Sequence, residues 1–308
     1  MSIEEFSHQH QISIANAIER KAELLNLSHS TLDHNFAVNL TNFLGSHTFF
    51  TSISLDYSQF NDVSTETLTS LFSSHQVTHI SLVGVPLIPD ITHALKAAEN
   101  IKSIDLTSCF CKEETSLDLI YELITEQTHI THLNLSMNPL KSIFFEKFFS
   151  ISNDYPFETL NFSHCAIDEI SVQHICDYLQ NTTTLLHLNL SHSSESLDDD
   201  CIDHIVDALH VNTTLVSLRL TDNDIHTEGG IALGSLVGLK APKRRKRRDK
   251  EEPEEEESED EPIVLESLDV LDIRRNPLKT RLKQDLLKHW RSAGKDTRGL
   301  MMTFYYQQ

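Results

Sequence analysis

Apolar and polar residues alternate over about five positions at nine places along this chain, as in the segment from His132 to Ser136. A period of two puts the leucines on one face and the polar residues on the other, which predicts short, half-buried strands. The first apolar position in each copy is termed its anchor. The nine anchors are Leu25, Ile53, Ile80, Ile104, Leu133, Leu160, Leu188, Leu218 and Leu271. Successive anchors lie 28, 27, 24, 29, 27, 28, 30 and 53 residues apart, so the pattern is a repeat.

Between the predicted strands, apolar residues follow helical spacing. One such stripe runs from Cys201 to Leu209 and follows Asp198–Asp200, whose negative charges suit the positive end of a helix. Asn181 and Asn212 end two of these stretches, and we expect a left-handed backbone there because asparagine tolerates it. A strand–turn–helix unit cannot bury its apolar face alone, so neighbouring units are predicted to stack around one continuous core.

A turn is predicted three residues after the second apolar position of each strand. There the chain turns inward, and a small polar side chain satisfies the stranded backbone groups. The residues at this turn position are Ser30, Ser58, Val85, Cys109, Asn138, Cys165, Ser193, Asn223 and Asn276. Val85 breaks the rule, and the spacing of 24 falls in the same repeat, so the third repeat is predicted to be irregular.

These residues resemble the leucine-rich repeat superfamily, specifically its ribonuclease-inhibitor-like branch with long helical repeats. The resemblance covers roughly residues 20 to 290. It implies an α/β fold, a horseshoe solenoid of about nine repeats with a parallel concave sheet and convex helices. The expected parts are a helical N-terminal cap (1–24), repeats 1–8 (25–239), an insert (240–263), the last repeat with its helix (264–292) and a C-terminal cap (293–308).

The insert accounts for the longest spacing and carries sorted charge. Between Ala241 and Ile263 it has no apolar residue, so a disordered loop is predicted. Its six consecutive cations are Lys243, Arg244, Arg245, Lys246, Arg247 and Arg248. After Pro242 this cluster resembles a nuclear localisation signal, which implies a nuclear import receptor as partner and a nuclear location. The alternative is that the cations only neutralise the acidic residues that follow; among those, Ser258 resembles an acidophilic kinase site.

Composition narrows the classes of function. A formal charge of -21 argues against direct nucleic-acid binding, which depends on clustered cations. No apolar run approaches the roughly 18 residues of a membrane span. The five cysteines are an odd number in a core-rich chain, which favours buried, reduced thiols and a reducing compartment.

We find no pattern for catalysis, a cofactor or a metal ion. His79, His132 and His187 share one repeat position in alternate units, so they are expected about 10 Å apart, too far for one metal ion to bridge. The cysteine spacings match no zinc site, and the glycines form no phosphate-binding loop. The sequence therefore predicts a protein that is not an enzyme.

A protein partner is expected on the concave face, where strand side chains point away from the core. The candidate contact residues are Arg219, Asp222, Asp224, Asp272, Arg274, Arg275, His132 and His187. For Asn134, Asn161 and Asn189 two interpretations stay open, a ligand role and a hydrogen-bonding ladder that only stabilises the sheet.

The predicted function is a non-catalytic protein–protein interaction scaffold that acts in the nucleus. The polar, glycine-poor composition of the repeats resembles that of effectors that intracellular bacteria inject into eukaryotic cells. This resemblance implies a location in the host nucleus and a host nuclear protein as partner. One alternative is a eukaryotic nuclear protein that binds histones or phosphatases. The other is an enzyme with an unrecognised site on the concave face.

Overall fold

The computed structural model describes two compact units of alternating strands and helices. The described residues are 8–74, 76–109, 115–126, 129–152, 155–193, 197–240 and 264–302. The first unit comprises Met1–Ala166 and Thr184–Leu190, and the second comprises Ile167–Thr183 and Ser191–Gln308.

The first unit contains parallel strands that neighbour one another in chain order. They are β1 (Leu24–Asn26), β3 (Ser52–Ser54), β5 (His79–Ser81), β6 (Ser103–Asp105), β7 (His132–Asn134), β8 (Thr159–Asn161) and β9 (His187–Asn189). The register pairs each anchor with the next, from Leu25 with Ile53 to Leu160 with Leu188. The sequence repeat is thus confirmed at the level of single residues. A second pair of parallel strands, β2 (Thr31–Leu32) and β4 (Gln59–Phe60), was not predicted.

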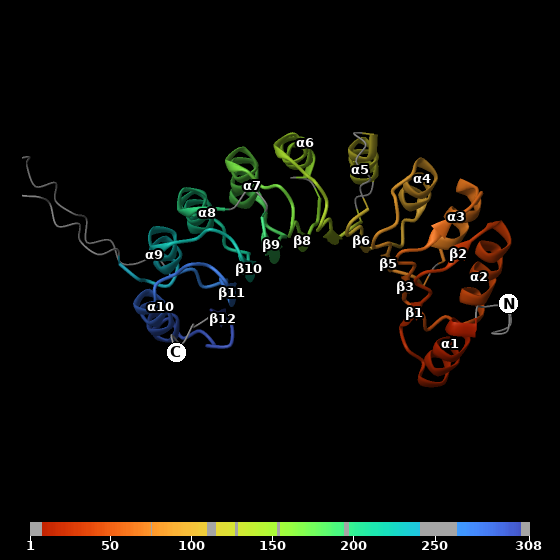
Figure 1. Ribbon diagram of the computed structural model, residues 1–308, viewed down its shortest axis with the longest axis horizontal. Coiled ribbons are helices and arrows are strands. Elements are labelled where there is room, and N and C mark those ends of the chain that lie inside the picture. The colour runs from red at the N-terminus through yellow and green to blue at the C-terminus, as the bar shows by residue number, and fades with distance from the viewer. Residues whose placement is uncertain are drawn as a thin grey trace, which may run out of the picture. The chain divides into compact units, whose positions relative to one another are not determined.

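The second unit repeats this design with β10 (Ser217–Arg219), β11 (Val270–Asp272) and β12 (Leu300–Met301), which are parallel and pair in that order. Helices lie on one side of the strands within each unit (Figure 1). In the first unit they are α1 (His8–Arg20), α2 (His34–Ser46), α3 (Thr65–Phe72), α4 (Pro89–Ala97), α5 (Thr115–Glu126) and α6 (Ser142–Ser152). In the second they are α7 (Glu169–Asn181), α8 (Asp199–Val211), α9 (Thr227–Ser235) and α10 (Thr280–Ser292).

The anchors form the core of both units, and none of the nine is more than 2% exposed. Burying one leucine or isoleucine side chain contributes roughly 1.5–3 kcal/mol, so the anchors are a main source of stability. The helical stripe from Cys201 to Leu209 is buried on α8 as predicted, and Asp198 caps that helix by accepting from the backbone N–H of Cys201. The α/β fold of stacked strand–helix repeats is confirmed.

The turn position also has its predicted role. In the first unit the amide nitrogen of Asn138 donates to the carbonyls of Leu106 (2.9 Å) and Leu135 (2.8 Å). Its amide oxygen accepts from the backbone N–H of Cys109 at 2.9 Å. Asn276 binds backbone groups of neighbouring repeats in the same way in the second unit. Where the turn position holds one of these two asparagines, a buried amide thus ties adjacent repeats together.

Three local features refine the predictions. Asn212 follows α8 in an extended conformation (φ -72°, ψ 130°), and Asn181 is the last residue of α7, followed by Thr182 in an extended conformation. The left-handed backbone predicted at both asparagines is therefore wrong. The Asn212 side chain ends α8 instead, because it donates to the carbonyl of Leu179 and accepts from the N–H of Leu215. The helical N-terminal cap predicted at 1–24 contains α1, on which Ile14 is buried whereas Ile12 is 63% exposed. In the third repeat α4 begins without a side-chain cap, but so do α9 and α10, and β5 pairs in the regular register, so the irregularity predicted for this repeat stays a prediction.

The residues on either side of the charged insert pair with each other. Val237 and Val264 form an antiparallel bridge, and the N–H of Leu265 donates to the carbonyl of Leu236 at 2.9 Å. The insert therefore leaves the second unit and returns to it at one place. The predicted import signal, Lys243–Arg248, and Ser258 lie outside the described residues. None of the helices in the described ranges is long and apolar enough to cross a membrane.

Candidate functional site

The candidate site is the strand face, defined here as the strand residues and the three residues after each strand whose side chains point away from the helices. In the second unit this face is charged. Arg219 at the end of β10 is exposed, and no ion pair of Arg219 is found among the described residues. Asp222 is held from both sides: His192 Nδ1 lies 2.8 Å and Arg275 Nη1 3.6 Å from its Oδ2.

These three residues share one backbone geometry. His192, Asp222 and Arg275 have φ values of 57°, 57° and 60°, at the same position of three repeats in the second unit. The side chains of Asp222 and Arg275 are 45% and 64% exposed. The structure thus brings Asp222 and Arg275, both predicted contact residues, together with His192, which the sequence analysis did not select.

Asp272 differs from the other predicted contact residues because its side chain is only 3% exposed. Arg274 clamps its carboxylate, with Nε 2.9 Å from Oδ1 and Nη2 2.7 Å from Oδ2. Burial raises the pKa of Asp272. Hydrogen bonds from Arg274 and Thr221, together with the Arg274 charge, lower the pKa by more than burial raises it, so the net shift is downward. Asp272 therefore positions Arg274, whose own side chain is 51% exposed and faces solvent.

Asp224 lies past the turn rather than on a strand. Its side chain is 58% exposed, and its Oδ1 is 3.7 Å from His226 Nδ1, just before α9 begins. The structure therefore separates Asp224 from the strand residues with which the sequence analysis had grouped it.

The strand face of the first unit is polar and holds its polar groups in hydrogen bonds. Asp56 Oδ2 accepts from Ser54 Oγ (2.9 Å). Its Oδ1 accepts from Ser81 Oγ (2.6 Å) and from the backbone N–H of Val83 (3.0 Å). Asp56 was not selected from the sequence as a site residue, although its place two residues after β3 marks it as a strand-face residue.

The neighbouring carboxylate, Asp105, has the same character. It accepts from the backbone N–H of Thr107 (2.9 Å) and from the amide of Asn134 (2.9 Å). The carbonyl oxygens of Asn134 and Asn161 accept from backbone N–H groups two residues later in their own repeats. For these two asparagines the contacts favour the stabilising ladder over a ligand role.

The strand-face histidines occupy alternate strands, as predicted. His79 is on β5, His132 on β7 and His187 on β9, and one strand separates each from the next. The ring of His132, which is half-buried, bonds Thr131 Oγ1 at 2.8 Å, whereas His187 is exposed. In the ranges that the structure describes, no three His, Cys, Asp or Glu side chains are grouped so as to hold a metal ion.

The described cysteines are buried, and burial is the main cause of their raised pKa values. The pKa of Cys109, Cys165 and Cys176 is raised to about 12, and that of Cys201 to about 11. Their thiols are protonated near neutral pH, which makes them poor nucleophiles.

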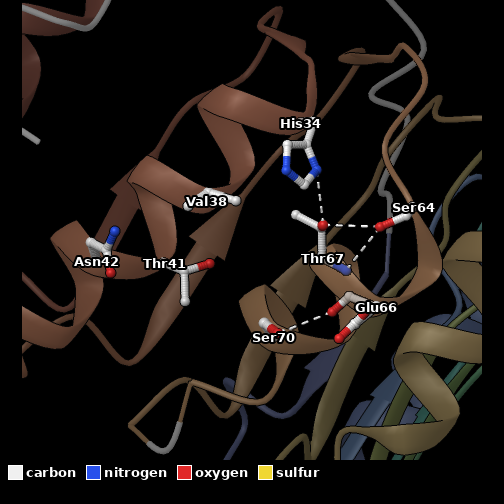
Figure 2. Close-up of a pocket in the computed structure, with 8 residues that line it drawn as sticks. All are labelled: His34, Val38, Thr41, Asn42, Ser64, Glu66, Thr67 and Ser70. Atoms are coloured by element: carbon white, nitrogen blue, oxygen red, sulfur yellow. Dashed lines mark hydrogen bonds between the residues drawn. The ribbon is translucent and has the colours of Figure 1, made fainter.

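A pocket of about 350 Å³ lies between α2 and α3, on the helix side of the first unit. Figure 2 shows that its polar groups bind one another: Thr67 Oγ1 contacts Ser64 Oγ (2.9 Å) and His34 Nδ1 (3.1 Å). Ser64 also caps α3 by accepting from the N–H of Thr67. These contacts stabilise the N-terminal end of α3, so we do not select the pocket as the candidate site.

Comparisons with known proteins agree with this architecture. Residues 126–142 and 211–234 match the family model described as Leucine Rich repeat. Both matched segments include a strand of the stacked strand–helix repeats, β7 in the first unit and β10 in the second. A comparison with curated proteins gives no match.

Two solved structures match the chain at low identity. Leiomodin-1 Actin-Binding Site 2 is 18% identical with a TM-score of 0.39, and the match covers 44% of this chain and 79% of that one. The TLR13–ssRNA13 complex is 14% identical with a TM-score of 0.46, and the match covers 92% of this chain and 33% of that one. Likeness at this level carries no argument about partner or activity.

Proposed function

We propose that this leucine-rich repeat chain is a non-catalytic scaffold that binds a protein partner through its strand face. The observation that carries the proposal is the charged surface of the second unit. There, Arg219, Arg274 and Arg275 are exposed on two neighbouring strands and the residues that follow them. Arginines are enriched among the residues that dominate binding energy at protein interfaces.

Rigid support favours recognition at this surface. Arg219 belongs to β10, which pairs with β11 in register. The Asp272 carboxylate fixes the Arg274 guanidinium through two hydrogen bonds. Side chains that are already ordered lose less conformational entropy when a partner binds. The partner expected at this surface presents carboxylates.

The test is proximity labelling in nucleated cells with two matched variants of the full chain. One variant carries Arg219→Glu and Arg275→Glu on the strand face, and the control carries Arg281→Glu and Arg291→Glu, exposed residues of α10. Both change the charge equally within one unit. We expect the strand-face variant alone to lose the recurrent neighbours of the wild-type chain by at least about tenfold, since a close charge pair contributes more than about 1.5 kcal/mol. Equal labelling by both variants would reject the strand face as the binding surface.

We further propose that the chain acts in the nucleus, with Lys243–Arg248 as the segment that a nuclear import receptor binds. The support is the run of six cations in the sequence and the paired residues at the base of the insert. Replacing the six cations by alanine in a fluorescent fusion is expected to abolish nuclear enrichment. The matched control replaces six acidic residues of the same segment, namely Glu251, Glu252 and Glu254–Glu257. Persistent nuclear enrichment without the cations would contradict this proposal.

The proposal includes delivery of the chain into a eukaryotic host by a bacterium, supported by the resemblance of its polar, glycine-poor repeats to such effectors. The alternative is a eukaryotic nuclear protein that binds histones or phosphatases, favoured by the acidic half of the insert. Proximity labelling separates the two when repeated without residues 241–262. Loss of histone neighbours in that deletion, with the strand-face neighbours retained, would support the alternative.

A further inference from the structure

One repeat position has a left-handed backbone throughout the first unit. It lies two positions after the second apolar residue of the strand, and the six residues that occupy it are His29 (φ 61°), Tyr57 (55°), Gly84 (67°), Ser108 (56°), Met137 (57°) and His164 (58°). Glycine adopts this conformation without strain, whereas a bulky side chain does not. Tyr57 and Met137 are nevertheless 55% and 56% exposed, so burial does not explain why large side chains stand there. The same conformation recurs at His192, Asp222 and Arg275, so it belongs to the turn of the repeat. It holds the exposed side chains of Tyr57 and Met137 in a fixed place.

Two of these residues form an exposed aromatic stack. The rings of His29 and Tyr57 are stacked, with centroids 5.3 Å apart and planes 9° from parallel. The Tyr57 ring lies over Gly84 of the next repeat, where an added Cβ would be only 2.5 Å from Cδ1 of Tyr57. Gly84 thus serves two needs, its left-handed backbone and the close approach of the ring. We name His29, Tyr57 and Gly84 the ring shelf.

A negative charge is fixed beside the ring shelf. The Asp56 carboxylate accepts from the backbone N–H of Val83 at 3.0 Å, while the Tyr57 ring covers the following residue, Gly84. On β1, β3, β5, β6, β7 and β8 and the three residues after each, the charged residues are Asp56 and Asp105, apart from histidines. A cation that approaches this face meets two carboxylates and, at these positions, no lysine or arginine.

We propose that the ring shelf binds an arginine side chain of the protein partner. A guanidinium is planar, always charged and weakly hydrated, so it stacks on an aromatic face, and the ring quadrupole attracts it. The Asp56 charge adds to this attraction. Lysine suits the shelf less well because its ammonium is compact and strongly hydrated. The inference deepens the proposed function and rests on it, since it names one feature of the partner.

The test uses the purified full chain and two fluorescent peptides, one of alternating glycine and arginine and one of alternating glycine and lysine. Affinities are measured by anisotropy at ~0.15 M salt, where charges more than about 8 Å apart are screened. We expect the wild-type chain to prefer the arginine peptide by about threefold. Tyr57→Phe keeps this preference, and Tyr57→Ala abolishes it.

Tyr57→Gly separates loss of the ring from loss of the fold. It relieves the left-handed strain, so the chain is expected to stay folded while its preference for arginine disappears. Gly84→Ala reaches the same end differently, because the new methyl group displaces the ring without deleting it. Equal affinity for the two peptides in the wild-type chain, or an unchanged preference in Tyr57→Gly, would overturn the inference.

The two proposals fail in distinguishable ways. One outcome is a partner that binds the Tyr57→Gly chain as well as wild type but fails to bind the Arg219→Glu, Arg275→Glu variant. That result would reject the ring-shelf proposal and support the scaffold proposal. If the chain prefers the arginine peptide but no protein partner depends on either surface, the proposed function is rejected instead.

Discussion

The strand faces of the two units differ in the kind and the exposure of their charged residues. In the first unit, Asp56 and Asp105 accept hydrogen bonds from side chains and backbone of their own and adjacent repeats. In the second, Arg219 and Arg275 extend into solvent, and Asp222 is 45% exposed. The same repeat geometry therefore supports two outcomes. A polar strand face is not by itself a binding surface, and the exposure of its side chains must be considered as well.

The largest expected effect tests a feature that both units share, the turn position. Asn276 is 2% exposed and binds five backbone groups, so Asn276→Ala leaves several of them without a partner. We expect a loss of about 3 kcal/mol in the free energy of unfolding, measured with urea. Asn138→Ala should behave alike in the first unit. A loss below about 1 kcal/mol for both would show that the turn amides do not hold the repeats together.

The next effect addresses the comparison directly. Asp56→Ala removes the acceptor of three hydrogen bonds and is expected to cost about 2 kcal/mol in the free energy of unfolding. Asp222→Ala, at an exposed ion pair of the second unit, is expected to cost less than about 0.5 kcal/mol. Urea unfolding measures both. Similar costs for the two substitutions would break the distinction between the strand faces.

Glycine substitutions sharpen the comparison at the level of the backbone. Gly294 in the second unit has φ 76° and nothing within 4 Å of an added Cβ, so Gly294→Ala costs only the left-handed strain, about 1 kcal/mol. Gly84→Ala adds the clash with Tyr57 and is expected to cost more, about 2 kcal/mol. Thermal unfolding ranks the pair. If both substitutions cost the same, the Tyr57 ring does not rest firmly on Gly84.

The smallest effect is the pH dependence from Asp272. The folded-state pKa of this carboxyl is lowered, so it binds its proton more weakly in the folded chain than in the unfolded chain. Its contribution to stability is therefore complete above the unfolded pKa of about 4 and is lost as pH falls through the lower folded pKa. Urea midpoints between neutral pH and pH ~3 should fall less steeply for Asp272→Asn than for wild type. Parallel curves for the two chains would contradict the Arg274 clamp.

The sequence was sufficient for those parts of the fold that recur. Leu25, Ile53 and the later anchors pair in the predicted register because one spacing rule governs every repeat. The role of Asn138 and Asn276 followed from the same rule. The short strands β2 and β4 escaped it because two-residue segments carry no periodicity.

The details of the site depended on contacts that spacing does not encode. A period of two places Asp272 outward, but the Arg274 side chain two residues later covers its carboxylate. The ring shelf joins Tyr57 to Gly84, 27 residues apart, at one repeat position (84 minus 57). Whether the Tyr57 ring contacts the Gly84 backbone depends on the orientation of the ring, which the repeat spacing does not determine. Asn212 misled the prediction because its side chain, rather than a left-handed backbone, ends the helix.

Hydrogen exchange of the full chain with and without its partner, once proximity labelling has identified one, tests the central claim most directly. The strand-face account predicts slower exchange in peptides that contain the strand ends of the second unit, at Arg219–Asp222 and Asp272–Arg275, with α8, α9 and α10 unchanged. Protection confined to those helices, with the strand ends exchanging as in the unbound chain, would contradict it.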